Sequence, residues 1–216
     1  MNNKKLRITC DGGAATGKST GAKLVANKFK LSYLSSGLLY RYASYIILKN
    51  KPKNIVNFLK IKFKALNYHR LNTLNLHKSK ISEHSAKIAK ISNVRNILKK
   101  YQKNFIKQNN RCVLEGRDAS TKILPNSDVK FFFICNLDIA AKRRYKELKK
   151  KSNKTKYKDV KMAIKKRNFM DKNRKISPLQ KHPDAIVVNT GNLNKRDMLA
   201  KMSKHIEKFL KNTYGK

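Results

Sequence analysis

A glycine-rich run near the start of the chain has the residue types and spacing that hold a nucleotide phosphate. It fits the pattern G-x-x-x-x-G-K-[ST] and comprises Gly12, Gly13, Ala14, Ala15, Thr16, Gly17, Lys18, Ser19 and Thr20. Glycines let backbone N–H groups turn inward around a phosphate, and the N-terminus of a following helix adds a positive dipole end. The Lys18 ammonium would reach the β- and γ-phosphates, and the Ser19 hydroxyl would hold Mg²⁺.

The segments around this run have the character that a phosphate loop requires. Residues 6–10 form a short apolar run typical of a buried strand. Residues 19–29 carry apolar side chains at helical spacing, among them Leu24, Val25 and Phe29. Because a chance glycine-rich turn lacks this strand–loop–helix setting, the sequence predicts that a nucleoside triphosphate is bound here.

The chain is strongly basic along its whole length. Its 216 residues include 53 Lys and Arg against 12 Asp and Glu, a formal charge of +41. Such a charge attracts anions of many kinds, but it supplies no sequence readout. Lys, Asn and Ile are abundant throughout, as in a chain encoded by AT-rich DNA, so we expect no specific nucleic-acid partner.

Cysteine usage and hydropathy place the chain in the cytoplasm. Cys10, Cys112 and Cys135 each lie in an apolar run and show no C-x-x-C spacing, which is typical of reduced core residues. The five histidines complete no metal site. The sequence begins without an apolar signal region and has no apolar run near the ~18 residues that a membrane span needs.

Apolar runs alternate with amphipathic segments along the chain, which predicts an α/β fold. The strands expected are 6–10, 31–34, 112–114, 130–135 and 185–188. The helices expected are 19–29, 38–48 with Ser36 as its cap, two within 81–106, and then 139–148, 160–171 and 194–210. Strands separated by helices form a parallel sheet covered on both faces, and ligands bind at the carboxyl ends of its strands.

Residues 51–80 have a different pattern from the rest of the chain. Ile61, Phe63 and Ala65 alternate with other residues, as do Leu74 and Leu76. Alternation is typical of strands, so the sequence predicts a small insert with a helical piece and one or two short antiparallel strands.

Five further stretches carry polar groups that could hold a second substrate. They are Ser36 to Arg41 (S-G-L-L-Y-R), Glu115 to Asp118 (E-G-R-D), Pro125 to Phe133, Arg143 to Leu148 (R-R-Y-K-E-L), and the set Arg167, Asp171, Arg174 and Ser177-Pro178-Leu179. In this order and register they resemble the bacterial cytidylate kinase family over nearly the whole chain. No single stretch is decisive, but five in register with a phosphate loop make the resemblance strong.

The resemblance implies an architecture. It is a P-loop NTPase-type three-layer sandwich with a five-stranded parallel sheet, forming one domain over residues 1–216. The core would comprise 1–50 and 81–216, with a small NMP-binding insert at about 51–80. A short lid at about 149–158, together with Arg143 and Arg144, would close over ATP and exclude water. Arg143 is therefore expected to bind ATP.

The resemblance and the residue types together assign roles to the acceptor site. A fork of guanidiniums suits phosphate oxygens, and Arg41, Arg117 and Arg174 are the candidates. Asp118 could accept the exocyclic amine of cytosine, although it could instead be a structural ion-pair partner. The other residues expected to contact CMP are Ser36, Tyr40, Arg95, Arg167 and Asp171, the last two at the ribose.

The implied reaction is phosphoryl transfer from ATP with Mg²⁺ to CMP or dCMP, catalysed by Lys18, Arg117 and Arg174 and performed by a monomer. Two alternatives stay open. One is another kinase on the same scaffold, acting on UMP, AMP or shikimate. The other is a basic RNA-associated protein that keeps the nucleotide loop without being an enzyme.

The chain departs from the usual family motifs at several positions. They are Gly13 for a proline, Ala15 and Ser120 for glycines, Ser35, Asn168 and Asn189 for aspartates, His77 for an arginine, and Ala86 for a base-contacting serine, with Ser85 beside it. The Cβ of Ala15 would be strained if its φ were positive.

Overall fold

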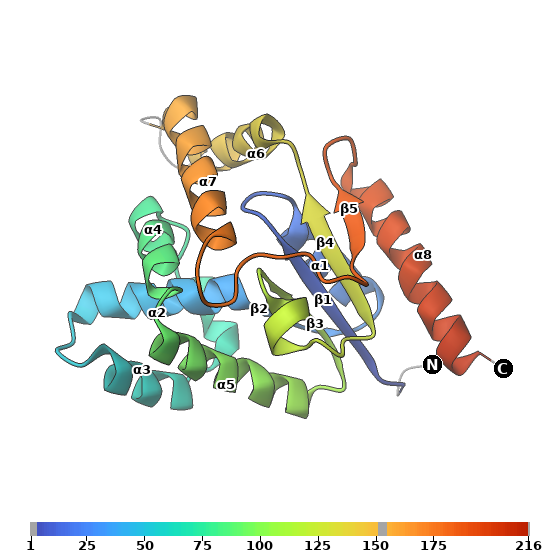
Figure 1. Cartoon of the computed structure of the whole chain (residues 1–216), viewed down its shortest axis with the longest axis horizontal. Coiled ribbons are helices and arrows are strands. Elements are labelled where there is room, and N and C mark those ends of the chain that lie inside the picture. Colours follow the sequence, from blue (N-terminus) through green and yellow to red (C-terminus); the bar gives the residue numbers. More distant parts are fainter. Residues whose placement is uncertain (1–3, 151–154, 216) are drawn as a thin grey trace. The chain divides into compact units, whose positions relative to one another are not determined.

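The computed structural model describes residues 4–150 and 155–215, and it contains a five-stranded sheet (Figure 1). The sheet has the order β2-β3-β1-β4-β5, and its strands run parallel. The strands are β1 (Leu6–Gly12), β2 (Ser32–Ser35), β3 (Arg111–Gly116), β4 (Val129–Ile134) and β5 (Ile186–Asn189). The predicted five-stranded parallel sheet is therefore confirmed.

The chain divides into two compact units. The first, called here the sheet unit, comprises Met1–Leu34 and Asn109–Lys216. The second, the helical unit, comprises Ser35–Gln108. It is larger than the insert expected at 51–80, because the helices before and after that segment belong to it as well.

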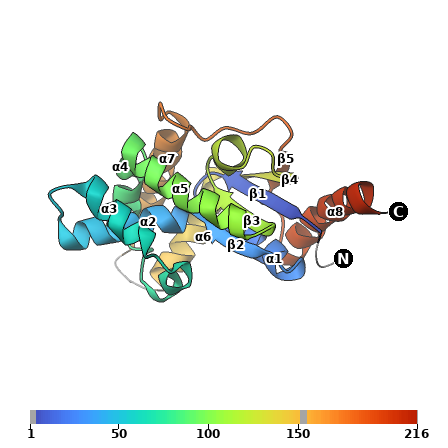
Figure 2. The same ribbon diagram turned by 90° about the horizontal axis from the view of Figure 1, so that it is seen from below.

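One face of the sheet unit is covered by two helices that lie side by side (Figures 1 and 2). They are α1 (Lys18–Lys28) and α8 (Lys195–Tyr214). Alternate residues of β1, such as Ile8 and Cys10, point to this face and pack with Val25 of α1 and Met202 of α8. This alternation is the period-2 pattern of a strand with one face in an apolar core.

The other face of β1 is polar and holds a turn that the sequence pattern did not predict. Thr9 and Asp11 point this way, and both are fully buried. A single-turn π-helix, η2 (Ala119–Ile123), packs against β1 and β3. Its first N–H groups, those of Ala119 and Ser120, donate to the buried Asp11 carboxylate.

Two more helices of the sheet unit pack against each other. They are α6 (Leu137–Lys149) and α7 (Tyr157–Lys172), with Ala141, Val160 and Ile164 between them. Ala14 and Ala15 of the phosphate loop pack against the same apolar cluster. Of the lid expected at 149–158, Lys149 is the last residue of α6, Tyr157 and Lys158 begin α7, and residues 151–154 fall outside the described part of the chain.

The helical unit contains helices only, among its described elements. They are α2 (Ser36–Asn50), α3 (Ile55–Lys64), the 3₁₀ helix η1 (Tyr68–Thr73), α4 (Ser79–Ile88) and α5 (Ser92–Gln108). The two helices predicted within 81–106 are confirmed as α4 and α5. The residue that caps α2 is Ser35, whose Oγ accepts the N–H of Leu38, so the prediction of Ser36 as the cap is wrong.

The strands predicted within 51–80 are also wrong. Leu59 and Phe63 are buried and lie four residues apart, so they occupy one face of α3. The Phe63 ring contacts the rings of Tyr42 and Tyr101, whereas Ile61 is 69% exposed. The apparent alternation at 61–65 arose because one apolar residue of α3 faces solvent.

Cys10, Cys112 and Cys135 are free thiols. Cys10 and Cys112 are buried within β1 and β3, as predicted for reduced core residues, and Cys135 follows β4 and is partly exposed. Within the described residues, the apolar stretches of the helices are too short or too often interrupted by charge to cross a membrane.

Candidate active site

The phosphate loop joins the end of β1 to the start of α1. Gly12 and Gly17 have φ values of 152° and 84°, which residues with a Cβ rarely adopt. A Cβ at Gly12 would also lie 2.4 Å from the carbonyl oxygen of Phe133. Both motif glycines are therefore required by the backbone, and the predicted strand–loop–helix arrangement is confirmed.

The Lys18 side chain is buried inside this loop. Its Nζ donates to the carbonyl oxygen of Gly13 at 3.0 Å and lies 3.7 Å from Oε1 of Glu115. Burial, and then the nearby Arg117, lower the pKa of Lys18 to about 7 although Glu115 acts in the opposite sense. A polyphosphate placed in the loop would add negative charge and favour the charged ammonium.

Glu115 is a site residue to which the sequence analysis gave no role. It is the last residue but one of β3, and the register pairs it with Cys10 of β1, two residues before Gly12 of the phosphate loop. The Tyr33 hydroxyl donates to its Oε2 at 2.7 Å, and the side chain is buried. Its position at the end of a predicted strand, in a chain with few acids, was the signal that could have revealed it.

Ala15 adopts the conformation that the sequence analysis expected to be strained. Its φ is 57°, in the left-handed region that favours glycine. For an L-residue with a Cβ this conformation costs about 1–2 kcal/mol. The loop thus holds strain at one residue.

Replacing Ala15 by glycine should therefore raise the free energy of unfolding by up to about 1.5 kcal/mol. The relief of strain is partly offset by about 0.4–1 kcal/mol, because glycine gains more freedom in the unfolded chain. Ala14→Gly is the matched control, since Ala14 packs on the same cluster without a positive φ. Urea unfolding should show the control to be destabilised by about 0.5–1 kcal/mol. Equal losses in both variants would contradict the strain.

A cluster of three arginines surrounds one carboxylate in the sheet unit. Asp171, near the end of α7, accepts a hydrogen bond from Nε of Arg117 at 2.8 Å. Arg174 Nη1 lies 3.6 Å and Arg167 Nε 3.8 Å from the same carboxylate. Burial disfavours the ionised form, but the three guanidiniums outweigh it and hold the pKa of Asp171 below its usual value. Four residues that the sequence assigned to the acceptor site thus lie together.

Asp118 lies at the edge of the same cluster. One of its carboxylate oxygens is 3.6 Å from Arg174 Nη2, and both side chains are buried. The alternative of an ion-pair partner is thus realised in this structure. The role at cytosine stays a prediction.

Asp11 holds the chain segment that carries Arg117 and Asp118. Its carboxylate accepts the N–H of Ala119 at 2.9 Å, and both the N–H and the hydroxyl of Ser120 at 2.7 and 2.6 Å. Ser120, which stands where the family usually has glycine, therefore contributes a third donor. This anchor has no local sequence signal, because the partners are 108 or 109 residues apart.

Arg143 on α6 is connected to the phosphate loop through a threonine. Its guanidinium donates to the hydroxyl and the carbonyl oxygen of Thr190 at 2.9 and 2.6 Å. The Thr190 hydroxyl in turn donates to the carbonyl oxygen of Thr16 at 2.8 Å. Arg143 is thus connected to the loop through Thr190, a contact that the sequence did not reveal, and its role in binding ATP stays a prediction.

The remaining predicted residues lie in the helical unit. Arg41 donates to the carbonyl oxygen of Leu76 at 3.1 Å and to the hydroxyl of Ser82 at 2.5 Å. The Arg95 guanidinium lies over the ring of Tyr40, 5.7 Å from its centre, and donates to a backbone carbonyl. Ser36 forms a hydrogen bond with the buried side chain of Gln102. Helix α2 therefore presents Ser36, Tyr40 and Arg41 within two turns, with Arg95 against Tyr40.

The residues around the loop fit a magnesium ion that arrives with a nucleotide. Ser19 is exposed in the first turn of α1, where its hydroxyl can reach solvent and ligand. Within residues 4–150 and 155–215, no group of three His, Cys, Asp or Glu side chains could hold a metal alone. Mg²⁺ commonly keeps several waters and binds through substrate phosphates with few protein ligands, which agrees with this donor set.

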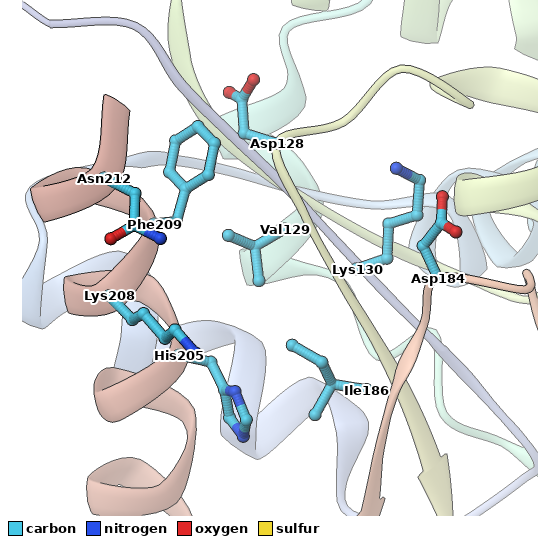
Figure 3. Close-up of a pocket in the computed structure, with 9 residues that line it drawn as sticks. All are labelled: Asp128, Val129, Lys130, Asp184, Ile186, His205, Lys208, Phe209 and Asn212. Carbon is cyan, nitrogen blue, oxygen red and sulfur yellow. The ribbon is translucent and has the colours of Figure 1, made fainter. Parts of the chain in front are cut away.

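A separate hollow of about 260 Å³ lies in the sheet unit (Figure 3). It is lined by the first residues of β4 and β5 and by α8, including Lys130, Ile186 and His205. The phosphate loop follows the carboxyl end of β1, whereas the hollow lies at the amino ends of the parallel strands β4 and β5. The hollow is therefore not part of the candidate site.

Comparison with known proteins agrees with the geometry. The family profile described as cytidylate kinase matches residues 8–208. A cytidylate kinase of Clostridium tetani (strain Massachusetts / E88) is 38% identical over 216 residues, covering 94% of both chains. One of Clostridium botulinum (strain Okra / Type B1) is 34% identical, covering 94% of this chain and 98% of its own.

A solved structure supports the fold alone. Shikimate kinase from Acinetobacter baumannii, in complex with shikimate, superposes with a TM-score of 0.50 at 12% identity. The match covers 99% of this chain and 97% of that one. The fold is consequently of the α/β P-loop type.

Proposed function

The chain belongs to the cytidylate kinase family, and from this membership we propose that it transfers the γ-phosphoryl group of ATP to CMP or dCMP, giving ADP and CDP or dCDP. The observation that carries the proposal is the pairing of two features in the sheet unit. One is the phosphate loop with Lys18 buried in it, and the other is the arginine cluster around Asp171. The alternatives of another small-molecule kinase and of an RNA-associated protein are not favoured.

At the donor side, the phosphate loop would bind ATP through residues 12–20. The backbone N–H groups and the start of α1 attract the phosphates, and the Lys18 ammonium neutralises charge on the β- and γ-phosphates. Arg143, fixed by Thr190, adds a positive charge next to the loop. Ser19 would hold Mg²⁺, which would supply charge neutralisation at the phosphates.

At the acceptor side, phosphoryl transfer requires positioning and charge neutralisation more than covalent chemistry. Arg117 and Arg174 are proposed to exchange part of their contact with Asp171 for the acceptor phosphate, because guanidiniums bind phosphate oxygens bidentately. Asp171 and Arg167 would then hold the ribose. In the helical unit, Ser36, Tyr40, Arg41 and Arg95 are the proposed CMP contacts.

We further propose that the helical unit as a whole, and not residues 51–80 alone, is the NMP-binding part. Its helix α2 carries three of the proposed contacts, and this helix lies before the segment that the sequence singled out. The protein is proposed to act as a monomer in the cytoplasm, without a specific nucleic-acid partner.

The test of the function is an ADP-release assay with a panel of acceptors. CMP and dCMP should support ADP release well above the rate with water alone, and UMP and AMP should support less. Shikimate serves as the acceptor for the alternative kinase class. Turnover with AMP or shikimate that exceeds turnover with CMP would contradict the proposal.

Base selectivity should depend on helix α4. Ala86 is buried and has no polar side chain, while the Ser85 hydroxyl donates to the carbonyl oxygen of Ser82 at 2.7 Å. A missing neutral hydrogen bond relaxes discrimination by a few-fold to about tenfold. We therefore expect Ala86→Ser to raise the CMP-to-UMP ratio of kcat/KM by a few-fold.

Two further variants decide the assignment of the base site. If Ala86→Ser leaves the ratio unchanged and Ser85→Ala lowers it, then Ser85 is the contact. Asp118→Ala should lower the ratio as well. An unchanged ratio in that variant would mean that Asp118 serves only as the partner of Arg174.

A further inference from the structure

Gly13 and Asn168, two positions at which this chain departs from the usual family motifs, lie next to each other at the phosphate loop. The N–H of Ala14 donates to Oδ1 of Asn168 at 2.8 Å. The preceding residue is Gly13, and a Cβ built there would lie 3.1 Å from the same oxygen and 3.4 Å from Cγ and Nδ2 of Asn168. Such contacts are tighter than ordinary van der Waals distances, so a side chain at position 13 would displace the Asn168 amide.

Gly13 is not required by its backbone. Gly12 and Gly17 have positive φ values, but the φ of Gly13 lies outside the left-handed region. The three atoms nearest to a Cβ built at this position all belong to the Asn168 side chain. The absence of a side chain at Gly13 therefore serves to admit Asn168.

The peptide between Gly13 and Ala14 is held at both ends. Its carbonyl oxygen accepts from Nζ of Lys18 at 3.0 Å and from the hydroxyl of Thr16 at 3.1 Å. Its N–H is held by Asn168. Asn168 therefore fixes the orientation of the peptide whose oxygen holds the Lys18 ammonium in the loop.

Asn168 also connects the loop with the arginine cluster. It lies on α7 next to Arg167, and three residues before Asp171. Ala14 and Ala15 also contact the apolar cluster between α6 and α7. One hydrogen bond thus links the helix that carries Arg167 and Asp171 to the loop that carries Lys18.

We propose that Asn168 is a positioning residue of the donor site, and that Gly13 and Asn168 act as one pair. That the nucleotide is ATP is taken from the function proposed above, and this proposal rests on it. With the pair intact, the phosphate loop has its binding shape before ATP arrives, so less binding energy is spent on ordering it. An acceptor atom at position 168 is what this role needs, and an aspartate would supply it as well.

The decisive experiment is a double-mutant cycle read out by ATP affinity. Gly13→Ala, Asn168→Ala and the double variant are compared with the wild type by calorimetric titration of MgATP without an acceptor. Each single variant should weaken ATP binding about 3- to 10-fold, the value of one hydrogen bond. The double variant should be no weaker than Asn168→Ala, because the displaced side chain is then absent.

Three controls separate positioning from a general loss of structure. Asn168→Asp keeps an acceptor for the Ala14 N–H and should restore ATP affinity to within about threefold of the wild type. Asn173→Ala removes an asparagine that caps the same helix, where its Nδ2 donates to the carbonyl oxygen of Phe169, and should leave affinity unchanged. The KM for CMP should stay within twofold in every variant, and thermal unfolding checks that each is folded.

The proposal is overturned if Gly13→Ala weakens ATP binding equally in both backgrounds, or if Asn168→Ala binds ATP like the wild type. It is also overturned if Asn168→Asp is as weak as Asn168→Ala. These readouts need no turnover. A wild type that binds ATP but fails to phosphorylate CMP would refute the proposed function and leave the cycle valid.

Discussion

Replacing Lys18 by alanine is expected to lower phosphoryl transfer by about 10²-fold or more, the typical effect of removing one strong electrostatic stabiliser. The Lys18 ammonium is the positive charge held inside the phosphate loop, 3.0 Å from the Gly13 carbonyl oxygen. Without it, charge on the β- and γ-phosphates is left to the loop amides and Mg²⁺. The measurement is kcat and kcat/KM with saturating CMP.

The same substitution should leave the fold intact. The buried lysine has its pKa lowered from 10.5 to about 7, so at neutral pH the folded state gains little from keeping the ammonium charged. The free-energy cost of burying this lysine begins as the pH falls below 10.5, grows as the pH falls to about 7, and is constant below that. Lys28→Ala is the matched control, because Lys28 is on the same helix, exposed, and contacts Glu207 and the ring of Phe29 at the surface. A folded Lys18→Ala protein with normal turnover would contradict the donor-site assignment.

The second large effect is expected for Asp171→Asn. Asparagine keeps the shape of the side chain but removes the charge that Arg117, Arg167 and Arg174 share. Removing one partner of a buried ion pair costs about 3–5 kcal/mol, because uncompensated charges remain. At the lower value, the unfolding temperature of a chain of this size should fall by roughly 6–12 °C. The kcat/KM for CMP should fall by about 10²-fold, because the arginines lose the group that orients them.

The control and the pH dependence make this prediction specific. Asp159→Asn is the matched control, since Asp159 is exposed in the first turn of the same helix. The folded pKa of Asp171 is lowered, so its stabilisation is present above the unfolded pKa of about 4 and is lost as the pH falls. The wild type and the variant should therefore converge in stability in acid. Equal stability of the wild type and Asp171→Asn at pH 7 would contradict a stabilising role of the arginine cluster around Asp171.

The parts of the fold that were predicted well from the sequence are those determined by residues close together in the chain. Gly12 and Gly17 are required by their positive φ values, which are a local property of the backbone, and both were expected from the motif. The strands and the helices α4 and α5 follow from periodicity, which reflects burial on one face of each element.

The parts that it missed depend on contacts between distant residues. Asp11 binds the N–H groups of η2 across more than 100 residues, and no periodicity marks either partner. The predicted cap of α2 was wrong by one position because Ser35 and Ser36 are adjacent and have the same side chain. Ser35 is the cap because its backbone is extended and its hydroxyl accepts the N–H of Leu38. Strands were predicted at 61–65 because the exposed Ile61 imitated an alternating pattern.

The location of Asp11 affects how the site responds to thermal motion. Asp11 directly precedes Gly12, so the last residues of β1 carry the start of the phosphate loop and also anchor the segment of Arg117 and Asp118. We therefore expect a displacement at the end of β1 to shift the donor loop and the segment of Arg117 and Asp118 together, because both are attached to the same two residues of the strand.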